Sequence, residues 1–116
     1  MKRALTHWKK NEAAATIRRS RLVLKTPVLD VKITPKTKIV ARVLPVTPRK
    51  SGSAPERNLF RRRIKALFHE LNLYEGAYDW IFFAKPGIAD LSFKQLRELF
   101  LQAVRSSSET PSPTSL

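Results

Sequence analysis

Apolar residues recur at helical spacing in the middle of the chain. The stretch Pro48–Leu71 begins as a basic turn and continues as a run in which hydrophobic side chains return every three or four residues. On a helical wheel at about 100° per residue, they share one arc: Phe60, Ile64, Leu67, Phe68 and Leu71. This pattern predicts an amphipathic helix that faces a core and ends near Asn72.

Other segments have the composition and alternation of strands. Residues 22–33 are apolar and β-branched, and residues 38–46 form a second such run after a turn. A hairpin of these two strands is the simplest arrangement. Residues 78–84 are the most apolar run of the chain, and their length and aromatic content predict a buried strand rather than a helix. Pro27 and Pro45 are confined to strand ends, edges or bulges.

Helices are predicted before and after these strands. Residues 4–20 contain strong helix formers, with Thr6 as the N-cap. The last helix begins at Ser92, whose spacing to Gln95 predicts a capping box. The order α-β-β-α-β-α describes a two-layer α+β sandwich.

The length of 116 residues fits one folded unit. We assign residues 1–105 to a single domain, because residues 106–116 are a Ser/Thr/Pro segment with nothing to bury. Such a composition predicts a disordered tail. If the strands that flank the central helix are parallel, the general rule predicts a right-handed crossover.

Positive charge is concentrated in the first part of the chain. The formal net charge is +14 at pH 7. Residues 1–65 hold 19 Lys and Arg against 3 acids, which gives +16, whereas residues 66–116 hold 4 against 6, which gives −2. This asymmetry indicates a polyanionic partner, either a nucleic acid or an anionic membrane surface.

Several other classes of protein are excluded or disfavoured. The chain has no cysteine, so it has no disulfide and no thiolate metal site. No apolar run approaches the ~18 residues that a membrane span needs. The N-terminus lacks the apolar region of a secretory signal. We therefore expect a cytoplasmic protein that is not embedded in a membrane.

The central helix carries arginines where they can follow a phosphate backbone. Arg57, Arg61 and Lys65 stack at i, i+4 spacing, where like charges repel and stability alone would favour alternating signs. The planar guanidinium forms bidentate, charge-assisted bonds to phosphate. The candidate RNA-binding residues are Arg49, Lys50, Arg57, Asn58, Arg61, Arg62, Arg63 and Lys65. A solvated basic face with no specific partner is the alternative interpretation, and Asn58 can also act locally as a cap.

Aromatic side chains offer a second kind of contact to RNA, because exposed rings stack on bases. A run such as residues 78–84 is more often simply core, and Trp8 is as well suited to packing against a sheet. The candidates for contacts to bases or to an extended strand are Trp8, Arg18, Arg19 and Trp80.

No protein active site is indicated. His7 and His69 lack the surrounding carboxylates or hydroxyls of a catalytic group, and there is no metal-ligand spacing, phosphate-cradling glycine loop or pair of carboxylates placed for acid–base chemistry. We predict no catalytic residue and no metal ligand.

Two motifs occur in order and carry a family resemblance. The first is Arg49-Lys50-x-Gly52-x-Ala54-x-x-Arg57-Asn58, followed by Arg61-Arg62-Arg63. The second is Asp79-Trp80-Ile81-Phe82-Phe83-Ala84-Lys85-Pro86-Gly87, followed by Asp90-Leu91-Ser92-Phe93. Together they resemble the protein component of bacterial ribonuclease P over about residues 42–104. One departure is Leu59, which stands where the family has the second arginine of its R-N-R sequence.

The resemblance implies an α-β sandwich of the ribosomal protein S5 domain 2-like type. It also implies a left-handed β-α-β crossover, and this expectation replaces the general right-handed rule.

The same resemblance implies a protein that binds the catalytic RNA of ribonuclease P and precursor tRNA and assists removal of the 5′ leader. Catalysis is expected in the RNA, which uses Mg²⁺, with no cofactor in the protein and one protein monomer for each RNA. The arginine-rich motif is expected to lie against the RNA subunit. A cleft between the first helix and the sheet is expected to hold the leader, which makes Trp8, Arg18, Arg19 and Trp80 candidate leader contacts.

Two other functions remain open from the sequence. A small ribosomal or other RNA-associated protein could use the same basic helix without processing tRNA. A protein that binds anionic membranes could use residues 57–71 as an interfacial helix. The latter requires Phe60, Ile64 and Phe68 to face lipid, and burial of these side chains in a structure would exclude it.

Overall fold

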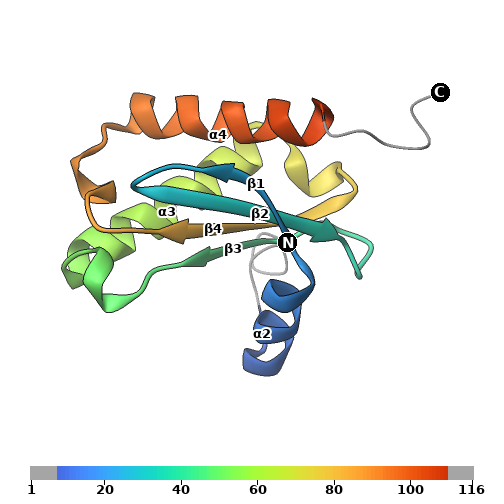
Figure 1. Ribbon diagram of the computed structural model, residues 1–116. Coiled ribbons are helices and arrows are strands. Elements are labelled where there is room, and N and C mark those ends of the chain that lie inside the picture. Colours follow the sequence, from blue (N-terminus) through green and yellow to red (C-terminus); the bar gives the residue numbers. More distant parts are fainter. Residues whose placement is uncertain (1–7, 110–116) are drawn as a thin grey trace.

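A computed structural model describes residues 8–109. Four strands form one mixed sheet in the order β1-β2-β4-β3 (Figure 1). β1 (Arg21–Lys25) and β2 (Leu29–Pro35) are antiparallel, β2 and β4 (Tyr78–Ala84) are antiparallel, and β3 (Val43–Val46) is parallel to β4. β1 and β3 are therefore the edge strands, and β4 lies in the interior with neighbours on both sides.

The predicted pairing of residues 22–33 with residues 38–46 is wrong. The first of these runs divides into β1 and β2, which pair with each other, whereas β3 pairs with β4. The division occurs because the Thr26 hydroxyl accepts hydrogen bonds from the N–H groups of Val28 and Leu29, which fixes a turn. Pro45 lies on an edge strand, as predicted.

Three α-helices complete the described part of the chain: α2 (Lys10–Arg19), α3 (Ala54–Glu70) and α4 (Phe93–Glu109). Three short 3₁₀ turns connect the elements: η1 (Arg49–Ser51), η2 (Leu73–Glu75) and η3 (Ile88–Asp90). The α+β class is confirmed, as is the alternation of its elements once the first expected strand is counted as the β1–β2 hairpin.

The helix ends test several sequence predictions. The capping box at α4 is present, because Ser92 N–H donates to Gln95 Oε1 at 2.8 Å and Gln95 N–H donates to Ser92 Oγ at 3.1 Å. α4 continues to Glu109, so it includes Ser106, where the sequence predicted the start of a disordered tail. The proposed N-cap Thr6 and residues 110–116 lie outside the described residues.

The connection from β3 through α3 to β4 sets the hand of the fold. Figure 1 shows β3 and β4 pointing the same way, with α3 passing behind the sheet between them. This crossover is left-handed, as the family resemblance implied and contrary to the general rule.

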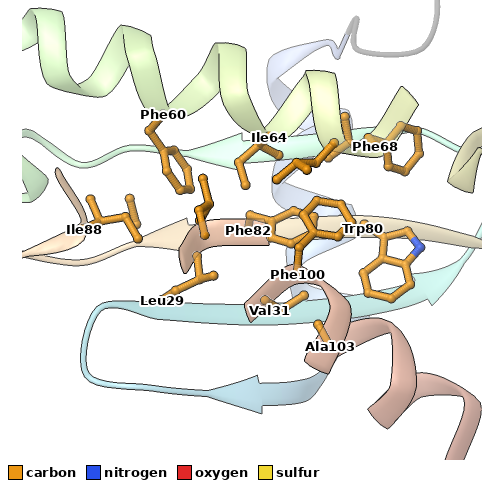
Figure 2. Packing of buried hydrophobic residues seen from close by; sticks show 14 of the residues in the cluster. Leu29, Val31, Phe60, Ile64, Phe68, Trp80, Phe82, Ile88, Phe100 and Ala103 are labelled. Carbon is orange, nitrogen blue, oxygen red and sulfur yellow. The ribbon is translucent and has the colours of Figure 1, made fainter. Parts of the chain in front are cut away.

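The core lies between the sheet and the pair α3 and α4 (Figure 2). Alternation along β4 turns Trp80 and Phe82 toward these helices, and the ring of Phe82 stacks on that of Phe100 with centroids 4.6 Å apart. Phe60, Ile64 and Phe68 of α3 are buried in the same cluster. Their burial excludes the interfacial membrane helix, which needed these side chains to face lipid.

Candidate nucleic-acid interface

The start of α3 is fixed by a reciprocal cap. Ser53 N–H donates to Glu56 Oε1 at 2.8 Å, and Glu56 N–H donates to Ser53 Oγ at 3.3 Å. Gly52 precedes the cap at φ 153°, and a Cβ at this position would lie 2.8 Å from Glu56 Oε1. The glycine therefore lets η1 turn closely against the helix, which brings the exposed Arg49 and Lys50 next to its N-terminal end.

A basic hollow lies on the outer side of α3. It has a volume of about 570 Å³ and is lined by Pro55, Asn58, Arg61, Arg62 and Lys65. Asn58, Arg62 and Lys65 are exposed. Four of the predicted residues, Asn58, Arg61, Arg62 and Lys65, thus line one concave surface, which we call the α3 hollow. Arg57 does not line it and donates from Nε to the carbonyl oxygen of Ser53 at 3.4 Å.

Neighbouring side chains hold one arginine of the α3 hollow in place. Arg61 donates from Nη1 to the hydroxyl of Thr47 at 2.6 Å and from Nη2 to the side-chain oxygen of Asn58. Asn58 is thus a side-chain partner of Arg61 within α3. Its alternative role as a helix cap is wrong, because Ser53 caps α3. An arginine that is already oriented loses less conformational entropy when it binds a phosphate.

The charges of the α3 hollow are not neutralised within the described chain. Within residues 8–109, Arg61, Arg62 and Lys65 form no ion pair, and the pairs made by Glu12, Asp30, Glu70 and Asp79 lie outside the hollow. Glu56, the acid nearest the hollow in sequence, is engaged in the cap with Ser53. An anion that enters the hollow therefore meets uncompensated positive charge.

Arg63 does not belong to this surface, contrary to the sequence prediction. It donates from Nη1 to the carbonyl oxygen of Leu91 at 3.2 Å, and its guanidinium lies 5.9 Å from the ring centroid of Phe93. The residue sits on the flank of α3 that faces the start of α4. Its contacts join the two helices, so we remove it from the candidate RNA-binding residues.

The remaining candidates divide between the two faces of the sheet. Arg18 and Arg19 are exposed at the C-terminal end of α2. Figure 1 shows α2 on the side of the sheet opposite α4. Trp80 is 3% exposed and stacks near Phe82 and Phe100 in the core, so it is not available to a base and its prediction as a contact is wrong.

A charged cluster that the sequence analysis missed lies beside α2, and two of its members, Arg42 and Asp79, are buried. Arg42 is 4% exposed, and its guanidinium lies 3.8 Å from the ring centroid of Trp8 and 3.1 Å from Glu12 Oε1. The N–H of Arg42 donates to Asp79 Oδ1 at 2.7 Å, and Trp8 Nε1 donates to the carbonyl oxygen of Val43 at 2.8 Å. We call Trp8, Glu12, Arg42 and Asp79 the Arg42 clasp. Trp8 thus packs against the edge of the sheet. This is the interpretation that the sequence offered as an alternative to stacking on RNA bases.

The pKa values of the two carboxylates of the clasp are shifted in opposite directions. Hydrogen bonding from Arg42 and from the N–H of Lys9 lowers the pKa of Glu12 from its ordinary value of 4.5. Burial raises the pKa of Asp79, and the hydrogen bond and charge of Arg42 offset only part of this effect. A charged residue inside an apolar run is the signal that could have identified the cluster, since Arg42 and Asp79 both interrupt such runs.

A family model described as Ribonuclease P matches residues 3–107. The chain belongs to the ribonuclease P protein family. A search of curated protein sequences found no match.

Solved structures of ribonuclease P proteins share the fold. The protein of Staphylococcus aureus superposes with a TM-score of 0.76 at 17% identity, covering 89% of this chain and 94% of that chain. The protein of Thermotoga maritima gives a TM-score of 0.69 at 17% identity, covering 83% of this chain and 91% of that chain. A mutant of the S. aureus protein, described as defective in mRNA degradation activity, gives 0.76 at 18% identity, covering 93% and 92% of the two chains.

Leu59, the departure from the ribonuclease P motif, lies outside the α3 hollow. It is 37% exposed and lines a shallow recess with Phe60 and Ile88, on the flank of α3 that carries Arg63. The replacement of an arginine at this position therefore leaves the charges of the hollow unchanged.

The potential metal ligands of residues 8–109 are dispersed. This part of the chain has no group of three or more His, Asp or Glu side chains that could hold a metal ion. Its helices are too short or too polar to cross a membrane.

Proposed function

We propose that this chain is the protein subunit of ribonuclease P and binds the catalytic RNA through the α3 hollow and η1. The observation that carries the proposal is the hollow itself, in which Arg61, Arg62 and Lys65 line one concave surface and have no acidic partner among residues 8–109. The match of residues 3–107 to the family model described as Ribonuclease P supports the RNA of that enzyme as the partner. The protein would lower the repulsion between two polyanions and thereby reduce the metal-ion concentration that the RNA requires.

We further propose that the protein assists removal of the 5′ leader from precursor tRNA without supplying a catalytic group. The described donor set does not fit a Mg²⁺ site. As the resemblance to ribonuclease P implies, we propose that Mg²⁺ is held by the RNA and that hydrolysis takes place there. Arg18 and Arg19 are the proposed contacts to the leader, on the face of the sheet that carries α2. One protein for each RNA is the proposed stoichiometry.

Reconstitution at low magnesium tests this function. A bacterial ribonuclease P RNA and a precursor tRNA are incubated with and without the protein, and release of the leader is measured. Leader removal that depends on the protein supports the proposal. Tight RNA binding without stimulation favours a ribosomal or other RNA-associated role, and absence of binding defeats both.

A pair of triple variants identifies the surface. The first variant carries Arg57→Ala, Arg61→Ala and Arg62→Ala, and the control carries Lys94→Ala, Arg97→Ala and Arg105→Ala in α4. Both remove three positive charges. For each phosphate that the variant no longer neutralises, the slope of log K against log salt should flatten by roughly 0.7–0.9. We expect flattening in the α3 variant and little change in the α4 variant; equal slopes would sink the assignment of the α3 residues.

A further inference from the structure

α2 has little apolar surface with which to hold its place on the sheet. Its sequence is mostly charged residues and alanine, and Thr16 is its buried residue. The Thr16 hydroxyl donates to Glu12 O of the same helix at 2.9 Å, so it supplies no polar contact to the sheet. Hydrophobic burial, the usual source of helix docking, is therefore small here.

The Arg42 clasp supplies the missing attachment. The guanidinium of Arg42 contacts both Trp8, which precedes α2, and Glu12, which lies in the first turn of α2. The backbone of Arg42 is tied to β4 through Asp79, and the indole of Trp8 is tied to β3 through Val43. Arg42 is 4% exposed, whereas the side chain of Glu12 is 28% exposed. Loss of Glu12 would leave the buried charge of Arg42 with less compensation, which favours the docked position of α2.

Charge repulsion makes such an attachment necessary. α2 and the residue before it carry Lys9, Lys10, Arg18 and Arg19 against the single acid Glu12, on a chain of net charge +14. Glu12, on α2, is attracted to Arg42, and Asp79, on β4, adds negative charge beside Arg42. Both carboxylates therefore favour the position of this basic helix on the sheet. Without them the helix would be repelled by the rest of the molecule.

We propose that Arg42 is a positioning residue for RNA binding: it docks α2 on the sheet and so presents Arg18 and Arg19 to the substrate. The inference rests on the proposed function and deepens it, because it concerns the substrate side of the protein rather than the α3 hollow. Arg42 itself is buried and does not touch RNA.

The first test replaces Arg42 by Met in the full chain, with Arg97→Met as the control. Both remove one charge, and Arg97 belongs to an exposed ion pair with Glu70. If the docked population of α2 falls to about a tenth, the apparent affinity for precursor tRNA falls about tenfold. We expect this loss for Arg42→Met, in the presence of ribonuclease P RNA, with a precursor whose leader is fluorescently labelled. Affinity for the ribonuclease P RNA alone and for leaderless tRNA should match that of Arg97→Met.

The second test uses the sign of a charge change. Glu12→Gln raises the net positive charge by one and leaves Arg42 in place. If Glu12 affected RNA binding only through the net charge of the protein, this variant would bind the precursor more tightly. We expect weaker binding, by about threefold for partial undocking, because the variant loosens α2.

Quenching of tryptophan fluorescence by acrylamide reports docking directly. The chain has two tryptophans, and Trp80 is buried in the core. The Trp8→Phe variant gives the Trp80 signal alone, so that the Trp8 signal is obtained by difference. Arg42→Met and Glu12→Gln should both increase quenching of Trp8 and leave Trp80 unchanged.

The outcomes separate this inference from the proposed function. If Arg42→Met binds the precursor as Arg97→Met does, or Glu12→Gln binds it as tightly as the parent chain, the positioning role is overturned while RNA binding through α3 stands. If the triple α3 variant binds ribonuclease P RNA normally, RNA binding through α3, and with it the proposed function, is overturned.

Discussion

Arg63 donates a hydrogen bond from Nη1 to the main-chain oxygen of Leu91, 3.2 Å away. Arg62, the preceding residue in the same basic run, lines the α3 hollow and is exposed. Successive residues of a helix are about 100° apart, so adjacent arginines face different surroundings. The run therefore combines a candidate phosphate contact with an attachment between helices.

Arg62→Ala and Arg63→Ala should have different effects. Arg62→Ala should weaken binding to ribonuclease P RNA and flatten its salt dependence, with little change in stability. Arg63→Ala should lower the free energy of unfolding by about 1 kcal/mol, the typical worth of one hydrogen bond, and leave the salt slope unchanged. Urea denaturation and RNA binding across a salt series measure the two effects, and an equal loss of RNA affinity in both variants would contradict the division.

Phe100→Ala should be strongly destabilising. The Phe100 ring is fully buried and stacks on Phe82 at 4.6 Å between centroids. Truncation of such a side chain costs roughly 3–5 kcal/mol, because it removes apolar contacts and leaves a cavity. Phe93→Ala in the same helix is the matched control, since Phe93 is exposed and its loss should cost no more than about 1 kcal/mol. Similar midpoints of urea unfolding for the two variants would argue against this core.

Gly87→Ala should destabilise the turn that follows β4. Gly87 has φ 97°, and an alanine Cβ would lie 3.1 Å from Val28 Cγ1. The backbone conformation alone should cost about 1–2 kcal/mol. Val28→Ala removes the steric part, so Gly87→Ala should cost less in that background and yet remain unfavourable. A double-mutant cycle of thermal unfolding checks this, and additive effects would show that Val28 is not the obstacle.

The contribution of Glu12 to stability should depend on pH. Its pKa is lowered in the folded state by the hydrogen bonds from Arg42 and the N–H of Lys9. A lowered pKa adds stability that is fully present above the ordinary value of 4.5 and is lost as pH falls through the lowered value. The difference in unfolding free energy between the parent chain and Glu12→Gln should therefore be constant near neutrality and shrink in acid. Urea titrations between about pH 3 and pH 7 measure it, and a difference that grows in acid would reverse the assignment.

Local patterns in the sequence predicted the elements that depend on local interactions. The spacing of Phe60, Ile64 and Leu67 predicted α3, and the spacing of Ser92 and Gln95 predicted the start of α4. The cap of α3 by Ser53 and Glu56 was missed although its Ser-x-x-Glu sequence carries the same signature. These features need no knowledge of distant partners.

Strand pairing and burial depend on contacts distant in sequence, and here the predictions failed. Nothing local in residues 38–46 indicates that β3 pairs with β4 after the whole of α3, nor that Ile39 would be 92% exposed in a loop. Trp80 was kept as a candidate base contact because exposed rings stack on bases, although an aromatic run of this kind is more often core. Its place was decided by Phe100, twenty residues later. Arg42 was missed because its partners come from two distant parts of the chain, residues 8–12 and β4.

β3 also determines whether the sheet can add a strand at one of its two edges. Because Trp80 N–H donates to Arg42 O, alternate residues of this parallel strand face β4, and Val43 and Pro45 turn their main-chain groups toward the open edge. Pro45 has no N–H to offer, and the carbonyl oxygen of Val43 is already occupied by the Trp8 indole. A second chain that approached this edge would find a poor template for pairing. Trp8, which holds α2 on the sheet, thus also disfavours aggregation through this edge.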